Sequence, residues 1–181
     1  MPVLDSDLEK ARQMFDVNVF GVVAVTQAFA PLLIRSHGTI LNIGSMMGYA
    51  PLPFNGFYNA SKAATNHLTD ILRQEMAPFG VKVILVITGV VKTNFFQHKK
   101  EKLPEGSRYE VAKETVEGIM SGESFEKYEA DRKGYARTVV ANALQGNPKA
   151  RVWEGGVAGM MWWAGQFLTT GVWVCFLPAA C

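Results

Sequence analysis

An apolar strand, a loop and a helix follow one another between Gly38 and Lys62, and this stretch constrains the fold most strongly. Residues 39–43 are apolar and rich in β-branched side chains between two glycines, which predicts a buried parallel strand. Residues 57–76 repeat apolar side chains at helical spacing and predict a helix. A parallel strand that leads into a helix is typical of an open α/β sheet, whose ligands bind at the carboxyl ends of the strands.

Three polar side chains follow this strand in an order that predicts acid–base chemistry. Ser45 lies just past the strand, and Tyr58 and Lys62 are four residues apart on the first turns of the helix, so they share one face. The lysine ammonium and the positive end of the helix dipole favour the phenolate, so we expect the pKa of Tyr58 to fall below its ordinary value of about 10. Such a tyrosine exchanges a proton with a carbonyl or alcohol oxygen as hydride moves, and Ser45 would hold that oxygen.

Further elements are predicted on both sides of this stretch. Ser6 and Glu9 form a capping box that begins a long helix. This helix runs towards Arg35, with Asn18 near its middle and a bend at Pro31. The other expected elements are a buried strand over 81–87, amphipathic helices over about 107–121 and 124–144, and a last short strand over 151–153.

The rest of the sequence excludes several classes of function. A net charge of +2 over 181 residues argues against a nucleic-acid-binding surface. Cys175 and Cys181 form no disulfide framework, which suits a reducing compartment, and we expect neither a secretory signal nor a metal site. A second Tyr-x-x-x-Lys spacing, at Tyr109 and Lys113, lacks a preceding strand and serine, so it is interpreted as a solvated helix face.

Ser45, Tyr58 and Lys62 resemble the active site of the short-chain dehydrogenase/reductases, which are enzymes with a Rossmann-type fold. Residues 18–21 resemble the family's Asn-Val-x-Gly segment, and residues 88–93 resemble its Pro-Gly-x-Val-x-Thr segment. Residues 59–64 are similar to its catalytic helix. The resemblance implies that the catalytic residues are Asn18, Ser45, Tyr58 and Lys62, and that Asn18, Tyr58, Lys62, Gly89, Val91 and Thr93 contact the cofactor.

The resemblance also implies a role for each group. The cofactor would be NADPH, with NAD as the alternative. The backbone of Asn18 would bind a water that links Lys62 to solvent, and Thr93 would contact the nicotinamide carboxamide. Thr88 stands where the family usually has proline, so we expect a loosened restraint on the loop that follows it.

The phosphate-binding part of such a fold is missing from this sequence. The family's Gly-rich turn between a first strand and a helix does not occur, and 155–159 is no substitute because it follows the last strand. We therefore expect an α/β chain that is the C-terminal portion of a Rossmann-type doubly wound parallel sheet, with three of seven strands. As a fragment or a truncated gene model, it should bind dinucleotide poorly or not at all by itself.

The chain ends in an apolar tail. Residues 1–156 are expected to form the partial catalytic domain, and 157–181 an uncharged tail with three tryptophans, long enough to span a bilayer or to lie in one leaflet. The alternative is a helix that covers the substrate pocket or packs in a dimer. Residues 152–156 and this tail are similar to the fungal NADPH-dependent 1-acyldihydroxyacetone-phosphate reductases of the same family, which implies the cytosolic face of the endoplasmic reticulum or a lipid droplet. A cytoplasmic protein is the alternative.

The predicted activity is therefore reduction of a lipid-like ketone, 1-acyldihydroxyacetone phosphate, to the alcohol. The basic cluster at Lys99, Lys100 and Lys102 could attract the phosphate of such a substrate, although a charge run is usually solvated surface. One rival is another dehydrogenase of the family that acts on a steroid, retinol or other alcohol. A second is a non-catalytic, membrane-bound remnant. A homodimer through the Asn18 and Tyr58 helices is expected from the family.

Overall fold

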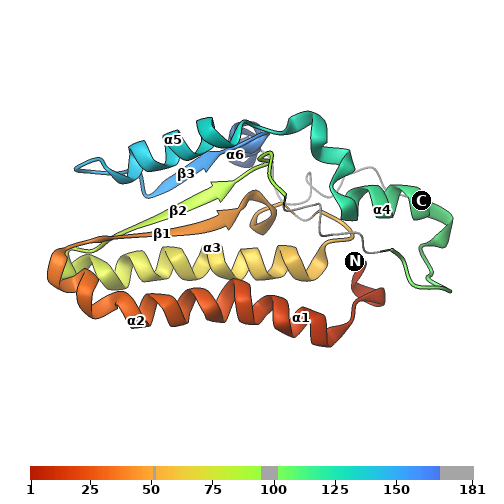
Figure 1. Ribbon diagram of the computed structural model, residues 1–181, viewed down its shortest axis with the longest axis horizontal. Helices are drawn as coiled ribbons and strands as arrows, with labels where there is room; N and C mark the ends of the chain where they lie inside the picture. Colours follow the sequence, from red (N-terminus) through yellow and green to blue (C-terminus); the bar gives the residue numbers. More distant parts are fainter. Residues whose placement is uncertain (51, 95–101, 168–181) are drawn as a thin grey trace.

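The computed structural model describes residues 1–50, 52–94 and 102–167, and these form an α/β fold around a small parallel sheet (Figure 1). The sheet contains β1 (Thr39–Ser45), β2 (Lys82–Thr88) and β3 (Arg151–Glu154), in the order β1-β2-β3. Both strand pairs are parallel, with Ser45 opposite Thr88 and Thr88 opposite Glu154. The predicted fold class and the three predicted strands are confirmed.

Helices cover both faces of the sheet. The α-helices are α1 (Leu8–Phe15), α2 (Gly21–Ser36), α3 (Gly56–Met76), α4 (Lys113–Ser121), α5 (Arg132–Ala143) and α6 (Ala158–Phe167). Shorter turns are η1 (Val3–Asp5), η2 (Asp16–Phe20), η3 (Met46–Gly48), η4 (Ala77–Phe79), η5 (Glu110–Ala112) and η6 (Glu123–Tyr128). In Figure 1, α2 and α3 run along one face of the sheet and α5 along the other.

The core follows the two-residue alternation of β2. Val83 packs with Met76 of α3 on one face, while Val86 packs with Val139 of α5 on the other. β1 is less buried than predicted, because no described strand pairs with its outer edge and Ile43 is 47% exposed. The prediction of a buried strand is therefore right for β2 and wrong for Ile43 in β1.

The long N-terminal helix is continuous from Leu8 to Ser36 and contains a π-helical turn, η2, in its middle. Asn18 lies in this turn, and π-helical turns are frequent at functional sites. The predicted Ser6 cap is wrong. Asp7 is the N-cap, since its Oδ1 accepts from the backbone N–H of Glu9 at 2.8 Å, whereas Ser6 donates to the carbonyl of Pro2.

The predicted helix over 124–144 is in fact two elements, η6 and α5. Backbone hydrogen bonds explain the break, because Ala130 donates to Val90 and accepts from Lys92, both at 3.0 Å. Asp131 then caps α5 by accepting from the N–H of Gly134 at 2.7 Å. The loop after β2 therefore pulls residue 130 out of any helix.

The predicted helix over 107–121 is also shorter, since α4 begins only at Lys113. Tyr109 and Lys113 are not one turn apart on a regular helix: the Tyr109 ring packs edge-on against Phe54 at 5.8 Å, and Lys113 pairs with Glu110. The interpretation as a solvated helix face is right for exposed Lys113 and wrong for Tyr109.

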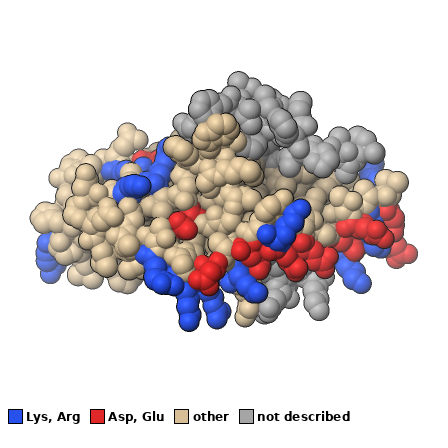
Figure 2. Space-filling model, turned by 90° about the horizontal axis from the view of Figure 1, so that it is seen from above, with Lys and Arg blue, Asp and Glu red and all other residues tan. Residues whose placement is uncertain are grey.

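Charge is unevenly distributed over the surface. Figure 2 shows acidic side chains gathered on one half of the visible face, and the segment 102–131 carries eight carboxylates against four Lys and Arg residues. Lys102 is exposed, while Lys99 and Lys100 lie outside the described residues. A contact between these three lysines and a substrate phosphate thus stays a prediction.

By length and apolar composition, the helix over 8–36 is the one described segment that could cross a membrane, a criterion that core helices of soluble proteins also meet. The expected apolar tail is described as far as residue 167, where α6 ends, and 168–181 lie outside the described residues.

Candidate active site

The hydroxyl of Ser45 stands at the carboxyl end of β1, as the last residue of the strand. Its side chain accepts from the N–H of Met47 at 3.1 Å, which begins the short turn η3. Asn66 of α3 hydrogen-bonds to both backbone polar groups of Ser45. The strand end and the helix are thus joined directly at the point where Ser45 faces the site.

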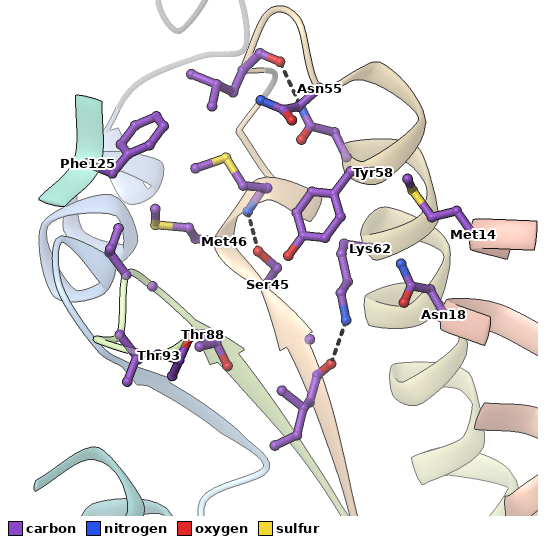
Figure 3. A pocket seen from close by; sticks show the side chains of 18 of the residues that line it. Met14, Asn18, Ser45, Met46, Asn55, Tyr58, Lys62, Thr88, Thr93 and Phe125 are labelled. Atoms are coloured by element: carbon purple, nitrogen blue, oxygen red, sulfur yellow. Dashed lines mark hydrogen bonds between the residues drawn. The ribbon is translucent and has the colours of Figure 1, made fainter. Parts of the chain in front are cut away.

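Tyr58 and Lys62 both project from the first turns of α3, Tyr58 towards Ser45 and Lys62 towards the backbone of β1 (Figure 3). Burial raises the pKa of Tyr58, and a hydrogen bond with the Ser45 side chain opposes this only in part. Burial lowers the pKa of Lys62, whose Nζ donates to the carbonyl of Ile43 at 3.2 Å. The expected lowering of the Tyr58 pKa by Lys62 is therefore wrong for this structure, because desolvation dominates and the ammonium contacts the β1 backbone.

Asn18 is tied to the helix that carries Tyr58. Its Nδ2 donates to Ser61 Oγ at 3.0 Å, and Ser61 Oγ donates to the carbonyl of Tyr58 at 2.8 Å. The Asn18 carbonyl accepts from Thr65 Oγ1 at 2.7 Å. Ser61 and Thr65 are buried, so these hydrogen bonds hold the π-helical turn against α3 away from water.

The loop after β2 is held in place by backbone hydrogen bonds. Val90 exchanges two of them with Gly156, at 2.8 and 3.0 Å, and Gly89 donates to the carbonyl of Glu154 at 2.8 Å. A Cβ at Gly89 would overlap the Gly156 carbonyl, so only glycine allows these two segments of the chain to approach so closely. The expected loosening after Thr88 is not seen, because these bonds do not need a proline.

One hollow of about 610 Å³ brings the predicted residues together. All of them line it: Asn18, Ser45, Tyr58, Lys62, Gly89, Val91 and Thr93. Figure 3 shows Ser45, Tyr58 and Lys62 on one side of the hollow and Thr93 across it. The second Tyr-x-x-x-Lys pair, Tyr109 and Lys113, does not line it.

Other residues of the hollow were not predicted. The apolar ones include Met14, Met46, Met47, Leu52, Ile119 and Phe125, and the polar ones are Asn55, Asn59, Thr88, Arg132 and Tyr135. Thr88 could have been found, because it ends β2 as Ser45 ends β1. Tyr135 and Arg132 could not, since the start of α5 was misplaced.

Comparisons with known proteins find related sequences. Residues 1–124 match the family model described as short chain dehydrogenase. The chain is 39% identical to the short-chain dehydrogenase virD of Hypocrea virens over 176 residues, which is 96% of this chain and 60% of that protein. It is 43% identical to the NADPH-dependent 1-acyldihydroxyacetone phosphate reductase of Schizosaccharomyces pombe over 111 residues, which is 61% of this chain and 36% of that protein.

Solved structures of this kind share the fold. A short-chain dehydrogenase from Streptomyces avermitilis is matched with a TM-score of 0.77 at 24% identity, over 92% of this chain and 60% of that one. One from Burkholderia cenocepacia, in complex with NADP, is matched with a TM-score of 0.74 at 26% identity, over 98% of this chain and 63% of that one. The chain thus spans about three-fifths of the length of virD and of these two solved structures.

Proposed function

This chain belongs to the short-chain dehydrogenase family, and on that premise we propose that it forms the catalytic part of a reductase that uses NADPH. One observation carries the proposal: the seven residues predicted for catalysis and cofactor contact line a single hollow at the carboxyl ends of β1 and β2. Ligands of open α/β sheets bind at that edge.

The residues of the hollow fit the nicotinamide end of a dinucleotide. Gly89, Val91 and Thr93 present a tethered loop, and Lys62 provides an ammonium donor for the ribose. NADPH, when bound, would supply the hydride that reduces the carbonyl carbon. The Gly-rich turn that would hold its phosphates does not occur in this sequence.

Each side chain has a role in the proposed reduction. Ser45 donates a hydrogen bond to the carbonyl oxygen and orients it, and Tyr58 gives that oxygen its proton. The raised pKa of Tyr58, which burial causes, keeps the phenol protonated at neutral pH, as a proton donor must be. Lys62 holds the ribose, while Asn18 supports return of the proton from solvent.

We propose a lipid-like ketone, 1-acyldihydroxyacetone phosphate, as the substrate. The likeness to the reductase of Schizosaccharomyces pombe supports this class of substrate. The apolar side chains of the hollow support it too, since methionine and phenylalanine suit a flexible acyl chain. The rivals are a steroid, retinol or other alcohol as substrate, and a remnant without activity.

A turnover assay separates these substrates. The extended chain, meaning this sequence preceded by upstream residues that bring it to the length of its relatives, is given NADPH with an acyl ketone phosphate, a ketosteroid or retinal. Preferred oxidation of NADPH with the acyl ketone phosphate supports the proposal, and preference for another compound supports the first rival. A well-folded extended chain that binds NADPH and reduces none of them supports the remnant.

We also propose that residues 157–181 bring the protein to the endoplasmic reticulum or a lipid droplet. The absence of charged residues from 155 onward supports this location, as do Trp162 and Trp163 on exposed faces of α6. Fluorescent fusions with and without 157–181 test it. A diffuse cytosolic signal from the intact fusion would favour the cytoplasmic alternative.

A homodimer through α2 and α3 is a further proposal. Val25, Phe29 and Leu32 on α2 are each more than half exposed, and Leu68 and Ile71 on α3 are partly so. An apolar face of this kind is normally covered. Sedimentation of the extended chain should give a dimer, and Phe29→Asp should give a monomer; a monomer before substitution would refute this surface.

A further inference from the structure

A second pair of hydroxyls lies in the same hollow as Ser45 and Tyr58. Thr88 Oγ1 and Tyr135 OH are 2.9 Å apart, and either atom can be the donor. Thr88 ends β2, and Tyr135 comes from α5, on the face of the sheet opposite α3. Both residues line the hollow, although neither belongs to the residues predicted for catalysis or cofactor contact.

The two pairs are neighbours across the sheet. Ser45 and Thr88 are register partners in adjacent parallel strands. Paired residues of this kind point to the same face, and the strands are about 4.8 Å apart. A group held by Ser45 and Tyr58 would therefore have the Thr88 hydroxyl beside it, as the labelled residues in Figure 3 indicate.

The second pair always has one hydrogen to offer. Burial raises the pKa of Tyr135, the hydrogen bond with Thr88 opposes this in part and the charge of Glu154 adds to it, so the phenol stays protonated at neutral pH. One O–H is used between Thr88 and Tyr135, and the other remains. Within the described residues, neither hydroxyl makes another hydrogen bond, and a partly buried O–H without an acceptor is costly.

A purely structural tie between β2 and α5 would not need these groups. The Tyr135 ring already packs on the core cluster of Ile84, Val86 and Val139, where a phenylalanine would serve as well. Thr88 and Tyr135 also line the hollow. Their position favours contact with what enters the site.

We propose that the Thr88–Tyr135 pair donates a hydrogen bond to an oxygen on the carbon next to the reacting carbonyl, so that the site selects α-oxygenated ketones. This rests on the proposed reductase function and narrows its substrate class. An ester, ether or hydroxyl oxygen in that position can accept the bond, whereas a methylene in its place leaves the donor without a partner. The cost of that unpaired donor separates the two classes of ketone.

Two matched ketones test the proposal in the extended chain. One carries an acyloxy group next to the ketone, and the other has a methylene in place of that oxygen. Thr88→Val and Tyr135→Phe should each lower kcat/KM for the oxygenated ketone about tenfold, mainly through KM, and leave the methylene ketone unchanged. The double variant should be little worse than either single one, because one shared bond is lost.

Controls separate this role from folding. Two variants remove the same chemical groups elsewhere: Thr138→Val on an exposed part of α5, and Tyr128→Phe outside the hollow. Neither should change kcat/KM for either ketone. Thr88→Ser keeps the hydroxyl and should retain the preference. If Thr88→Val lowers kcat/KM equally for both ketones, the pair only joins β2 to α5 and the proposal is wrong.

Binding measurements cover the remaining outcomes. Weaker NADPH binding with an unchanged ketone preference would assign the pair to the cofactor and overturn the proposal. If the unaltered chain reduces neither ketone, the reductase function fails. Calorimetric titration with both ketones then tests the role of the pair separately. If the unaltered chain binds the oxygenated ketone more tightly and Thr88→Val removes this difference, the proposal is supported. Equal affinities for the two ketones reject it.

Discussion

The backbone of Ser45 and the side chain of Asn66 hydrogen-bond to each other in both directions. The Ser45 N–H donates to Asn66 Oδ1 at 3.3 Å, and Asn66 Nδ2 donates to the Ser45 carbonyl at 2.9 Å. Asn66 is 2% exposed, so water cannot replace it. Gly44 and Gly48 leave room for this amide, because a Cβ at either position would overlap it. One residue of α3 therefore sets the position of the strand end at the site.

Asn66→Ala should destabilise the fold. Both backbone groups of Ser45 would lose a buried partner, which costs about 2 kcal/mol in the free energy of unfolding. Urea denaturation of this chain, followed by circular dichroism, measures the loss. Asn147→Ala removes the same amide from an exposed position and should stay within about 0.5 kcal/mol of the unaltered chain. Equal stability of the two variants would show that Asn66 does not hold the strand end.

Gly156→Ala should disturb the loop that carries Gly89 and Thr93. A Cβ there would overlap the Tyr128 carbonyl and crowd that of Val90, so the backbone has to move, at a cost of at least about 2 kcal/mol. Gly159→Ala is the matched control, because no atom of the described residues lies within 4 Å of its added Cβ. Within helix α6 that change should be neutral or stabilising. A Gly156→Ala chain as stable as the control would contradict the close approach.

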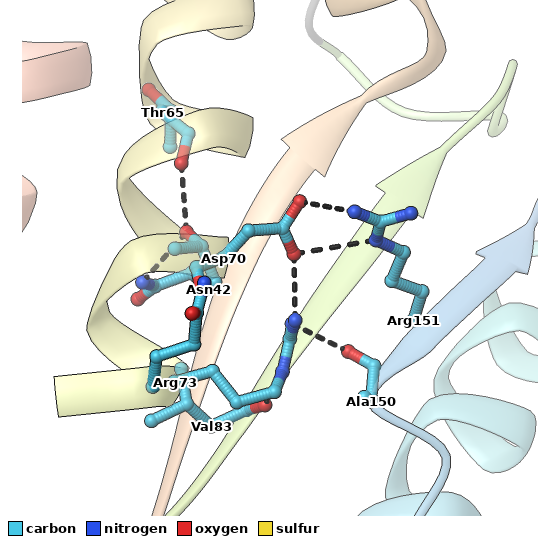
Figure 4. Close-up of polar contacts among 9 residues, drawn as sticks. Asn42, Thr65, Asp70, Arg73, Val83, Ala150 and Arg151 are labelled. Atoms are coloured by element: carbon cyan, nitrogen blue, oxygen red, sulfur yellow. Dashed lines mark hydrogen bonds and ion pairs between the residues drawn. The ribbon is translucent and has the colours of Figure 1, made fainter. Parts of the chain in front are cut away.

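Asp70 on α3 lies between two arginines and joins the helix to the sheet (Figure 4). Arg73 Nη1 is 2.7 Å from Asp70 Oδ1, and Arg151 Nη2 is 2.6 Å from Oδ2. Arg73 also donates to the carbonyls of Val83 and Ala150. Burial works to raise the pKa of Asp70, but the hydrogen bonds from Arg151 and Arg73 outweigh it and hold the pKa below the usual 3.8.

This depressed pKa predicts a loss of stability in acid. The contribution of Asp70 is complete above its unfolded pKa, near 4, and is lost as the pH falls through the lower folded value. Asp70→Asn should therefore cost about 1–2 kcal/mol at pH 7 and make the remaining acid dependence shallower. Denaturation curves between pH 7 and about pH 2 measure both, with Glu75→Gln as an exposed control. An unchanged acid dependence would rule out this role.

Structural features that follow from a local sequence pattern could be predicted, whereas those that depend on contacts with distant residues could not. The β-branched run of β2 and the spacing of Tyr58 and Lys62 are local patterns, so the strand and the shared helix face could be predicted. The break before α5 depends on backbone hydrogen bonds about forty residues back in the sequence, because Ala130 donates to Val90 and accepts from Lys92, and no local signal marks it.

The electrostatics of Tyr58 were missed for a similar reason. A neighbouring lysine one turn away suggests a lowered pKa, yet the depth at which α3 packs on the sheet decides how strongly burial opposes it. Asn66, Thr65 and Ser61 of that helix are buried, although they are small or polar and carry no helical signal of burial. The composition of the hollow was missed too, since its apolar residues come from separate segments.

Dinucleotide binding should require more than this chain. The hollow has residues for the nicotinamide end, but the sequence has no Gly-rich turn for the phosphates. A fluorescence titration with NADPH should detect binding by the extended chain and little or none by residues 1–181 alone. Micromolar binding by the shorter chain would refute this division of the site.

Turnover by Tyr58→Phe in the extended chain tests the central claim most directly. The substitution removes one hydroxyl oxygen from the hollow and keeps the ring, so NADPH binding should persist while ketone-dependent oxidation of NADPH falls at least about a thousandfold. Tyr109→Phe, in the second Tyr-x-x-x-Lys pair outside the hollow, should retain full turnover. Loss of turnover in the first variant alone is the predicted result; retained turnover in Tyr58→Phe would contradict the account.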